Sequence, residues 1–226
     1  METLLRSLFL LLFSVPALAL SLDDVSRQDA AGGLKEALTQ GAGAAVAQLG
    51  RADGFLGNPK VKIPLPEGLR QAEGLMRGLG MGKQADELVV AMNRAAEGAV
   101  GEAKPILVDA VKKMTIQDAK QILTGGDDAG TQYFRSATSA QLTEKFLPIV
   151  KKATAKVGLA EKYNQIAAKG AQFGLIKEKD ANIDRYVTQK ALDGLYQMIA
   201  EEERAIRHDP LGAAGSLAKK VFGAIK

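Results

Sequence analysis

The sequence predicts an all-α protein that folds as a single compact domain of about eight to ten helices. Apolar residues recur at helical spacing along most of the chain, whereas the alternation of apolar and polar residues that is typical of a strand never lasts more than a few positions after Leu20. The 226 residues include no stretch with the composition of a flexible linker and no repeat of the solenoid type. A chain of this length can bury a substantial core within one domain.

The first 19 residues have the composition of a cleavable export signal. Arg6 precedes an apolar run over residues 8–13, and the triplet Ala17-Leu18-Ala19 has small residues at its first and third positions. This is the order of n-region, h-region and cleavage site in a secretory signal peptide. The run is too short to cross a bilayer, which takes roughly 20 residues. We therefore expect cleavage after Ala19, a periplasmic location, and a helical domain over residues 20–226 without a transmembrane segment.

The first predicted helix runs from about Gln28 to Leu49 and combines an apolar stripe with small residues at every fourth position. The small residues are Gly33, Ala37, Gly41 and Ala45. Because small side chains at this spacing let another helix approach closely, we expect a tight internal crossing here. Residues 50–67 should be irregular, since Pro64 and Pro66 remove backbone donors and hold the chain extended.

Further helices are expected along the rest of the domain. One runs from Pro66 to about Gly80, and its inward face should carry Leu69, Ala72, Leu75, Met76 and Leu79. Others are expected over residues 83–101, 105–114 and 116–124, the last capped by Thr115 and Asp118.

In the second half, Asp127 and Asp128 are expected to cap a short helix that ends near Arg135. A separate helix, kinked at Pro148, should run from Thr138 or Ser139 to about Val157. The remaining predicted elements are a short helix over residues 159–168, a turn over 170–179, a long helix from Asn182 to His208 and a short segment over 216–222.

Composition removes several classes of chemistry. The chain has no cysteine and one histidine, His208, which excludes thiolate catalysis and argues against a zinc site or a serine triad. The phosphate-binding loop motif fails at Arg77 and Gln84. We expect no metal and no cofactor. The net charge of +4 looks scattered along the sequence, and we expect no nucleic-acid partner, although weak contact with a membrane surface is compatible with it.

Polar residues within helices supply the candidate site. Asn93 and Glu97 share a helix face, and Arg94 can pair with Glu97 three positions on. Glu203 and Arg207 stand four positions apart on the last long helix. Such residues can form structural salt bridges, line a ligand site or supply the catalytic carboxylates of an enzyme. We favour the structural role for each of them.

Several segments taken together resemble a family of exported bacterial proteins known as domain-of-unknown-function family 4197. They are Lys62-Ile63-Pro64-Leu65-Pro66, Met92-Asn93-Arg94-Ala95-Ala96-Glu97, Asp118-Ala119-Lys120-Gln121-Ile122-Leu123, Tyr133-Phe134-Arg135, Leu192-Asp193-Gly194-Leu195-Tyr196, the stretch from Glu203 to Pro210, and Lys220-Val221-Phe222-Gly223. The resemblance implies a compact helical periplasmic domain and transfers no catalytic residue. It also suggests that the polar residues of these segments have a shared role. The candidate polar network or ligand site consists of Asn93, Arg94, Glu97, Asp128, Tyr133, Arg135, Glu203 and Arg207.

The leading functional hypothesis is a non-enzymatic protein of the cell envelope that binds a partner protein or an apolar small molecule between its helices. One alternative is an enzyme that depends on carboxylates such as Glu97 and Asp128, or on a metal they hold. The other is a peripheral membrane protein that uses the small-residue helix over residues 32–49 and the lysines Lys219 and Lys220.

Overall fold

The computed structural model describes residues 27–80, 82–172 and 180–209, together with residues 219 and 221. Within them the chain forms eight helices and no strand. The predicted signal peptide with Ala19 lies outside these residues, as do residues 173–179 of the predicted turn and most of the predicted final segment. In the described part of the chain, no helix combines the length and the apolar character needed to cross a membrane.

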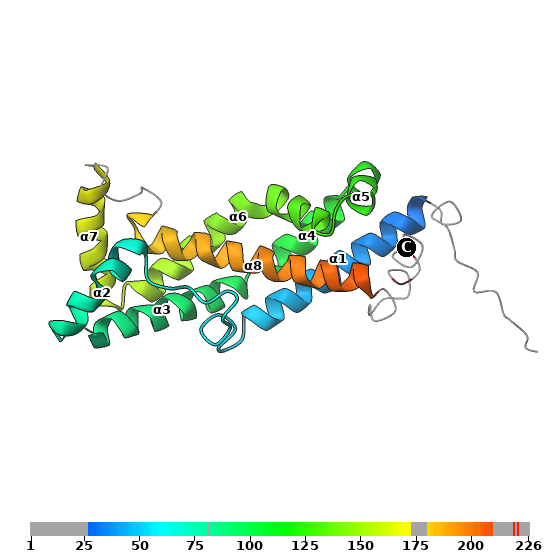
Figure 1. The fold of residues 1–226 in the computed structure, drawn as a ribbon. Coiled ribbons are helices and arrows are strands. Elements are labelled where there is room, and N and C mark those ends of the chain that lie inside the picture. The colour runs from blue at the N-terminus through cyan, green and yellow to red at the C-terminus, as the bar shows by residue number, and fades with distance from the viewer. Residues whose placement is uncertain (1–26, 81, 173–179, 210–218, 220, 222–226) are drawn as a thin grey trace, which may run out of the picture.

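Four helices of 19 residues or more run along the length of the molecule: α1 (Arg27–Leu49), α3 (Gly82–Val100), α6 (Ala129–Thr154) and α8 (Ile183–His208). The shorter helices are α2 (Glu67–Gly78), α4 (Lys104–Lys113), α5 (Ile116–Leu123) and α7 (Gly158–Gln172). Figure 1 shows an elongated bundle with α2 and α7 at one end and α5 at the opposite end.

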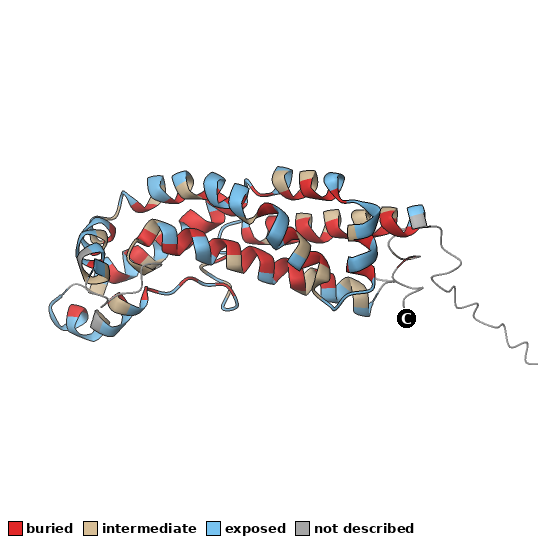
Figure 2. Cartoon of the chain, turned by 90° about the horizontal axis from the view of Figure 1, so that it is seen from above, coloured by how far each residue is buried: buried red, intermediate tan, exposed pale blue. Residues whose placement is uncertain are grey.

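The core lies between the long helices, whose inward faces are buried along their length (Figure 2). Its largest fully buried side chains include Phe55, Phe134, Phe146 and Tyr196. The apolar stripe predicted for the first helix is confirmed, since Leu34 and its helical neighbours are buried, and the inward faces of α3 and α8 bury residues such as Met92 and Leu195. Burial of apolar surface is the main stabilising term for such a bundle.

The close helix crossing predicted from the small residues of α1 is confirmed. α1 packs against α8, and a Cβ atom added at Gly41 would lie 3.4 Å from the Cβ of Glu202 and 3.7 Å from the Cδ1 of Ile206. Even a methyl group at Gly41 would already touch α8, which shows how closely the two helices lie.

The predicted boundary within residues 127–157 is wrong. The structure has one continuous helix, α6, where the sequence suggested a short helix and a longer one. Ser136, Thr138 and Ser139 look like a break in the sequence, but their hydroxyls donate to the carbonyl groups of Tyr133, Phe134 and Arg135 within the helix. Pro148 also lies inside α6, which continues to Thr154.

The predicted inward face of α2 is partly wrong. Leu69 and Met76 are buried, whereas the side chains of Leu75 and Leu79 are each 69% exposed. α2 lies at the end of the bundle (Figure 1), and its main packing partner among the described helices is α3. The apolar residues on its opposite face consequently stay in contact with solvent.

Candidate functional site

Asn93 holds the irregular segment between α1 and α2 against α3. Its side chain is fully buried, and its Oδ1 accepts a hydrogen bond from the backbone N–H of Ile63 at 2.8 Å. Its Nδ2 donates to the carbonyl oxygens of Ile63 at 2.9 Å and Val89 at 2.8 Å. The amide thus satisfies both backbone groups of one extended residue, much as a neighbouring strand would.

Glu97, one helical turn after Asn93, fixes the beginning of the same segment. Its Oε1 accepts hydrogen bonds from the backbone N–H groups of Phe55 and Leu56, both at 3.1 Å. Its Oε2 lies 2.7 Å from Nη1 of Arg94, whose Nη2 is 2.8 Å from Oδ1 of Asp53. These hydrogen bonds, the one to Glu97 first, raise the pKa of Arg94 above its ordinary value.

Asp53 has a positive φ of 65°. Asn and Asp are the non-glycine residues that tolerate this left-handed conformation best, so the turn and its ion pair with Arg94 suit each other. The far end of the segment is held from α8, where the hydroxyl of Tyr186 donates to the carbonyl oxygen of Pro64 at 3.1 Å. Burial raises the pKa of Tyr186 to about 12.

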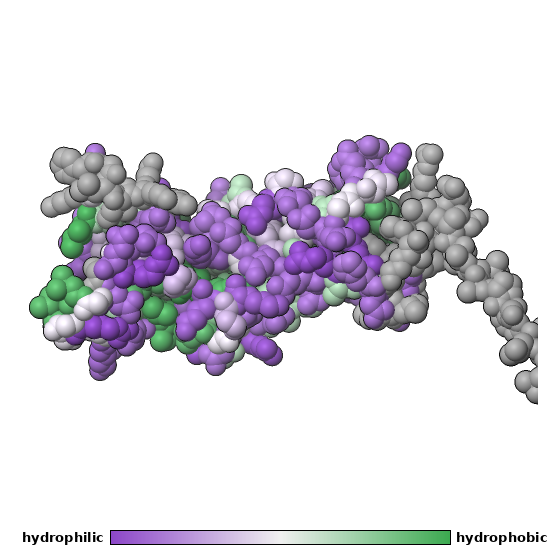
Figure 3. Space-filling model, in the orientation of Figure 1, coloured by the Kyte–Doolittle hydropathy of each residue, from purple (hydrophilic) through white to green (hydrophobic). Residues whose placement is uncertain are grey.

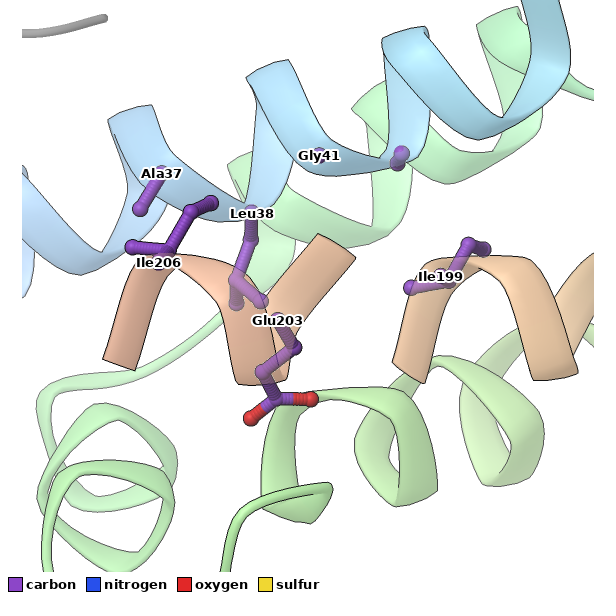
Figure 4. A pocket seen from close by; sticks show the side chains of 7 residues that line it. Ala37, Leu38, Gly41, Ile199, Glu203 and Ile206 are labelled. Atoms are coloured by element: carbon purple, nitrogen blue, oxygen red, sulfur yellow. The ribbon is translucent and has the colours of Figure 1, made fainter. Parts of the chain in front are cut away.

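Glu203 of α8 caps the N-terminus of α6 from another helix. Its Oε1 accepts from the backbone N–H of Gly130 at 2.9 Å, and its Oε2 accepts from the backbone N–H and the hydroxyl of Thr131 at 2.8 and 2.9 Å. The first N–H groups of a helix have no intrahelical acceptor, and a carboxylate there also complements the helix dipole. In Figure 4 the Glu203 carboxylate points away from α1.

Arg207 completes this arrangement. Its Nη2 lies 2.8 Å from Oε1 of Glu203 and donates to the carbonyl oxygen of Ile122, near the end of α5, at 2.9 Å. The side chains of Arg207 and Glu203 are only 9% and 4% exposed. The pair therefore joins α8 to both α5 and α6 in a place that excludes most solvent.

The other three candidate residues lie on or next to α6, where Asp128 and Tyr133 are half-buried and Arg135 is exposed. The hydroxyl of Tyr133 donates to the carbonyl oxygen of Ala110 at 2.8 Å, and partial burial raises the pKa of this tyrosine. The guanidinium of Arg135 stacks 4.6 Å from the ring centroid of Tyr196 and lies 3.4 Å from Oδ1 of Asp193. Asp128 precedes α6 without the predicted capping hydrogen bond, since Glu203 takes up those donors.

The eight candidate residues therefore do not meet in one network. Asn93, Arg94 and Glu97 form one cluster with residues 53–63, which we call the α3 clamp. Glu203 and Arg207 form a second with the start of α6, which we call the α8 cap. Asp128 and Tyr133 instead line a surface depression of about 660 Å³ with α5 residues such as Asp118 and Ile122.

The chemistry of the two buried clusters is that of structural hydrogen bonding. Every buried side-chain nitrogen or oxygen of the described residues has a hydrogen-bond partner. The carboxylates of Glu97 and Glu203 are each shared between backbone N–H donors and an arginine. Among the described residues, no group of three or more His, Asp or Glu side chains is placed to hold a metal ion.

Two hollows flank the crossing of α1 and α8. One is a cavity of about 10 Å³ between the helices, lined by residues that include Leu38, Ile199 and Glu203 (Figure 4). The other is an open groove of about 640 Å³, which we call the α1–α8 groove. Its lining residues are Thr39, Gln40, Gly41, Gly43, Ala44, Lys104, Glu202, Ala205, Ile206 and Asp209.

Sequence reasoning missed both the donors of the α8 cap and the α1–α8 groove. Gly130 and Thr131 carry no local sign that a glutamate more than 70 positions later binds them. For the groove a signal existed, because Gly41 belongs to the small-residue series of α1, and Gly43 and Ala44 follow it. From that series the sequence predicts an internal contact or a membrane-facing surface, but not the space that it leaves on the outer side of the crossing.

These features define the protein as an all-helical bundle with buried polar clusters that join its helices and an open groove along one crossing. The chain belongs to the family described as protein of unknown function (DUF4197), whose family model matches residues 24–223. The resemblance noted from the sequence segments is thereby confirmed. No curated protein and no solved structure matched the chain.

Proposed function

We propose that the chain is an exported, non-enzymatic binding protein of the cell envelope, and that it captures a segment of a partner protein in the α1–α8 groove. The observation that supports this proposal is the groove. Its volume lies in the range that binding sites commonly have. Small or apolar residues such as Gly43, Ala44 and Ile206 line it, together with the charged residues Lys104 and Glu202. Apolar contact area with a few polar groups is the usual composition of a recognition site.

The interior of the bundle offers less support for a small-molecule ligand. The cavity between α1 and α8 measures about 10 Å³, which is room for about one water molecule. A drug-sized ligand needs a site of roughly 300 Å³ or more. This favours a partner that binds at the surface over an apolar molecule held between these two helices.

The contacts of the buried carboxylates favour binding over catalysis. Glu97 and Glu203 are occupied by backbone N–H groups and by Arg94 and Arg207. A general base must reach a proton of its substrate. These two carboxylates instead hold together parts of the fold, so the enzyme alternative receives no specific support from them.

The test blocks the groove without disturbing the core. A Cβ atom added at Gly43 would meet nothing within 4 Å, so Gly43→Leu projects a large side chain into open space while raising helix propensity. Gly98→Leu on α3 is the matched control, because Gly98 is an exposed helical glycine and, like Gly43, has nothing within 4 Å of an added Cβ atom. A photo-crosslinking residue at Ala44 reports on occupancy of the groove in living cells.

We expect one defined adduct with a different protein at position 44, reduced about tenfold or more by Gly43→Leu and unchanged by Gly98→Leu, where tenfold corresponds to about 1.4 kcal/mol. An adduct that Gly43→Leu leaves intact would contradict the proposal, and so would an adduct with the mass of two copies of this chain. Native mass spectrometry supplies a further check, since a co-purifying small molecule would support the alternative ligand.

A further inference from the structure

The positive charge of the chain is concentrated at one end of the bundle. Residues 151–172 contain five lysines and one glutamate, a net charge of +4, and residues 67–90 contain three basic and four acidic residues, a net charge of −1. Together these two stretches have a net charge of +3, whereas the whole chain has +4. They include α2 and α7, which lie at the same end of the molecule (Figure 1). The charge that looked scattered in the sequence is therefore gathered by the fold.

The lysines at this end are exposed. Lys151 and Lys152 occupy the last turn of α6, Lys156 follows that helix, and Lys162 lies on α7. None of the four forms an ion pair with an acidic side chain of the described residues. Their charge is therefore available to an anionic partner.

Exposed apolar side chains lie on the same two end helices. Among the described residues, five large apolar side chains are exposed, and three of them belong to this end: Leu75 of α2 at 69%, Leu79 at the C-cap of α2 at 69%, and Ile166 of α7 at 70%. Leu75 and Leu79 are four positions apart and share the outer face of α2. Figure 3 shows hydrophobic surface gathered at this end.

The apolar and basic residues are interleaved on α7. Ala160, Tyr163 and Ala167 bury its inner face, and the hydroxyl of Tyr163 donates to the carbonyl oxygen of Asp180 at 2.7 Å. Lys162 and Ile166, again four positions apart, lie on its exposed side. A surface helix that presents both an apolar residue and a lysine to solvent is suited to an interface between water and hydrocarbon.

We propose that this end of the bundle, formed by the outer faces of α2 and α7 and the lysines around them, docks on an anionic phospholipid surface. Leu75, Leu79 and Ile166 enter the region between headgroups and acyl chains, and Lys151, Lys152, Lys156 and Lys162 contact the phosphate groups. This places the membrane contact on helices other than the small-residue helix that the sequence suggested. A second copy of the chain suits this end less well, because two such ends carry charge of the same sign.

The experiment measures binding of the purified protein to vesicles. Vesicles of equal parts phosphatidylglycerol and phosphatidylcholine are compared with vesicles of phosphatidylcholine alone, and the bound fraction is separated by flotation. We expect binding to the anionic vesicles to be about tenfold or more tighter, because each basic residue near an anionic surface contributes about fivefold in affinity.

Two variants of the docking end are compared with two matched controls. The first variant replaces Lys151, Lys152, Lys156 and Lys162 together by Gln, and it should bind anionic vesicles about 50-fold or more weakly. Its control, Lys112→Gln/Lys120→Gln, alters two exposed lysines on α4 and α5 and should have little effect. Leu75→Ser/Leu79→Ser/Ile166→Ser should abolish vesicle binding, whereas Ile116→Ser, which alters a 60% exposed isoleucine on α5, should retain it. All the altered side chains are exposed, so the variants keep the core.

Equal binding to both kinds of vesicle would overturn the proposal, and so would losses of the same size in the end variants and their controls. A dimer in solution that the leucine and isoleucine substitutions dissociate would instead identify a second copy of the chain as the occupant, which also overturns it. Lipid docking and the α1–α8 groove are independent, so we expect Gly43→Leu to bind vesicles as the unaltered protein does. The lipid-docking proposal can therefore fail without affecting the partner-binding proposal, and the reverse also holds.

Discussion

At the scale of single residues, the described polar groups of the core act as connectors between segments that are distant in sequence. Glu203 supplies the acceptors that the first N–H groups of α6 need, and Glu97 does the same for Phe55 and Leu56. Both carboxylates also bind an arginine, so their charge is compensated. A buried charge with a complete set of partners is tolerated, whereas one that loses its partner is strongly destabilising.

This contrast gives a prediction for Glu203→Ala. The substitution removes the acceptor of the Gly130 and Thr131 N–H groups and breaks the ion pair with Arg207, in which the side chains of Arg207 and Glu203 are 9% and 4% exposed. We expect the free energy of unfolding to fall by about 3–5 kcal/mol, as for other buried pairs that lose one member. Chemical denaturation followed by circular dichroism measures the change.

Glu144→Ala is the control for that measurement, because Glu144 is an exposed glutamate within α6. It should change the stability by no more than about 0.5 kcal/mol. If both substitutions had the same small effect, the α8 cap would contribute nothing to the fold, and the role assigned to Glu203 would be wrong.

At the scale of whole elements, those helix ends that are determined locally were predictable. The capping box of Thr115 and Asp118 is present, with the Thr115 hydroxyl accepting from the Asp118 N–H at 3.1 Å. Asn182 caps α8 as expected, since its Oδ1 accepts from the Arg185 N–H at 3.0 Å. In both cases donor and acceptor are three positions apart, so the sequence contains the complete interaction.

The elements that the sequence failed to predict depend on contacts between distant residues. Asp128 was assigned the capping role at α6 because it precedes the helix, but the acceptor comes from Glu203, 73 positions after Gly130. Leu75 and Leu79 fit an apolar stripe by spacing alone, yet α2 lies at the end of the bundle and no described helix buries these two side chains. Local spacing identifies an apolar face, whereas the fold decides whether anything covers it.

The irregular segment between α1 and α2 gives a prediction at this scale. Asn93→Ala removes the partners of the N–H and carbonyl groups of Ile63, which is 1% exposed. We expect a loss of about 2–4 kcal/mol, since each buried backbone group left without a partner costs about 1–3 kcal/mol. Hydrogen exchange of the Ile63 amide should accelerate more than that of the Phe134 amide in the middle of the core.

Equal acceleration at both amides would mean that the substitution only lowers global stability, and the α3 clamp would then have no local role. Selective acceleration at Ile63 would show that the clamp holds this segment against α3. The comparison distinguishes the two cases because exchange through local opening and exchange through global unfolding have different free energies.

At the scale of the whole molecule, the two proposed contact surfaces belong to different parts of an elongated bundle. The basic, apolar end lies at α2 and α7, whereas the α1–α8 groove involves Ile206 and Asp209 at the other end of α8. α8 has 26 residues, which corresponds to about 39 Å at 1.5 Å per residue. A protein held on a lipid surface by its basic end would therefore present the groove away from that surface.

Both proposals place the protein in the cell envelope, so the export signal is the expectation on which they most depend. The signal rests on the order of Arg6, the apolar run over residues 8–13 and the triplet that ends at Ala19. The match to the family begins at residue 24, downstream of the predicted cleavage site. Expression of the full sequence with a C-terminal tag in a double-membraned bacterium should give a periplasmic product whose first residue is Leu20, as measured by intact mass.

Ala19→Arg should block processing and leave the longer chain associated with the membrane, because the cleavage site requires a small residue at that position. A tagged chain of full length recovered from the cytosol would remove the basis for an envelope partner, while leaving the vesicle-binding measurement to stand on its own.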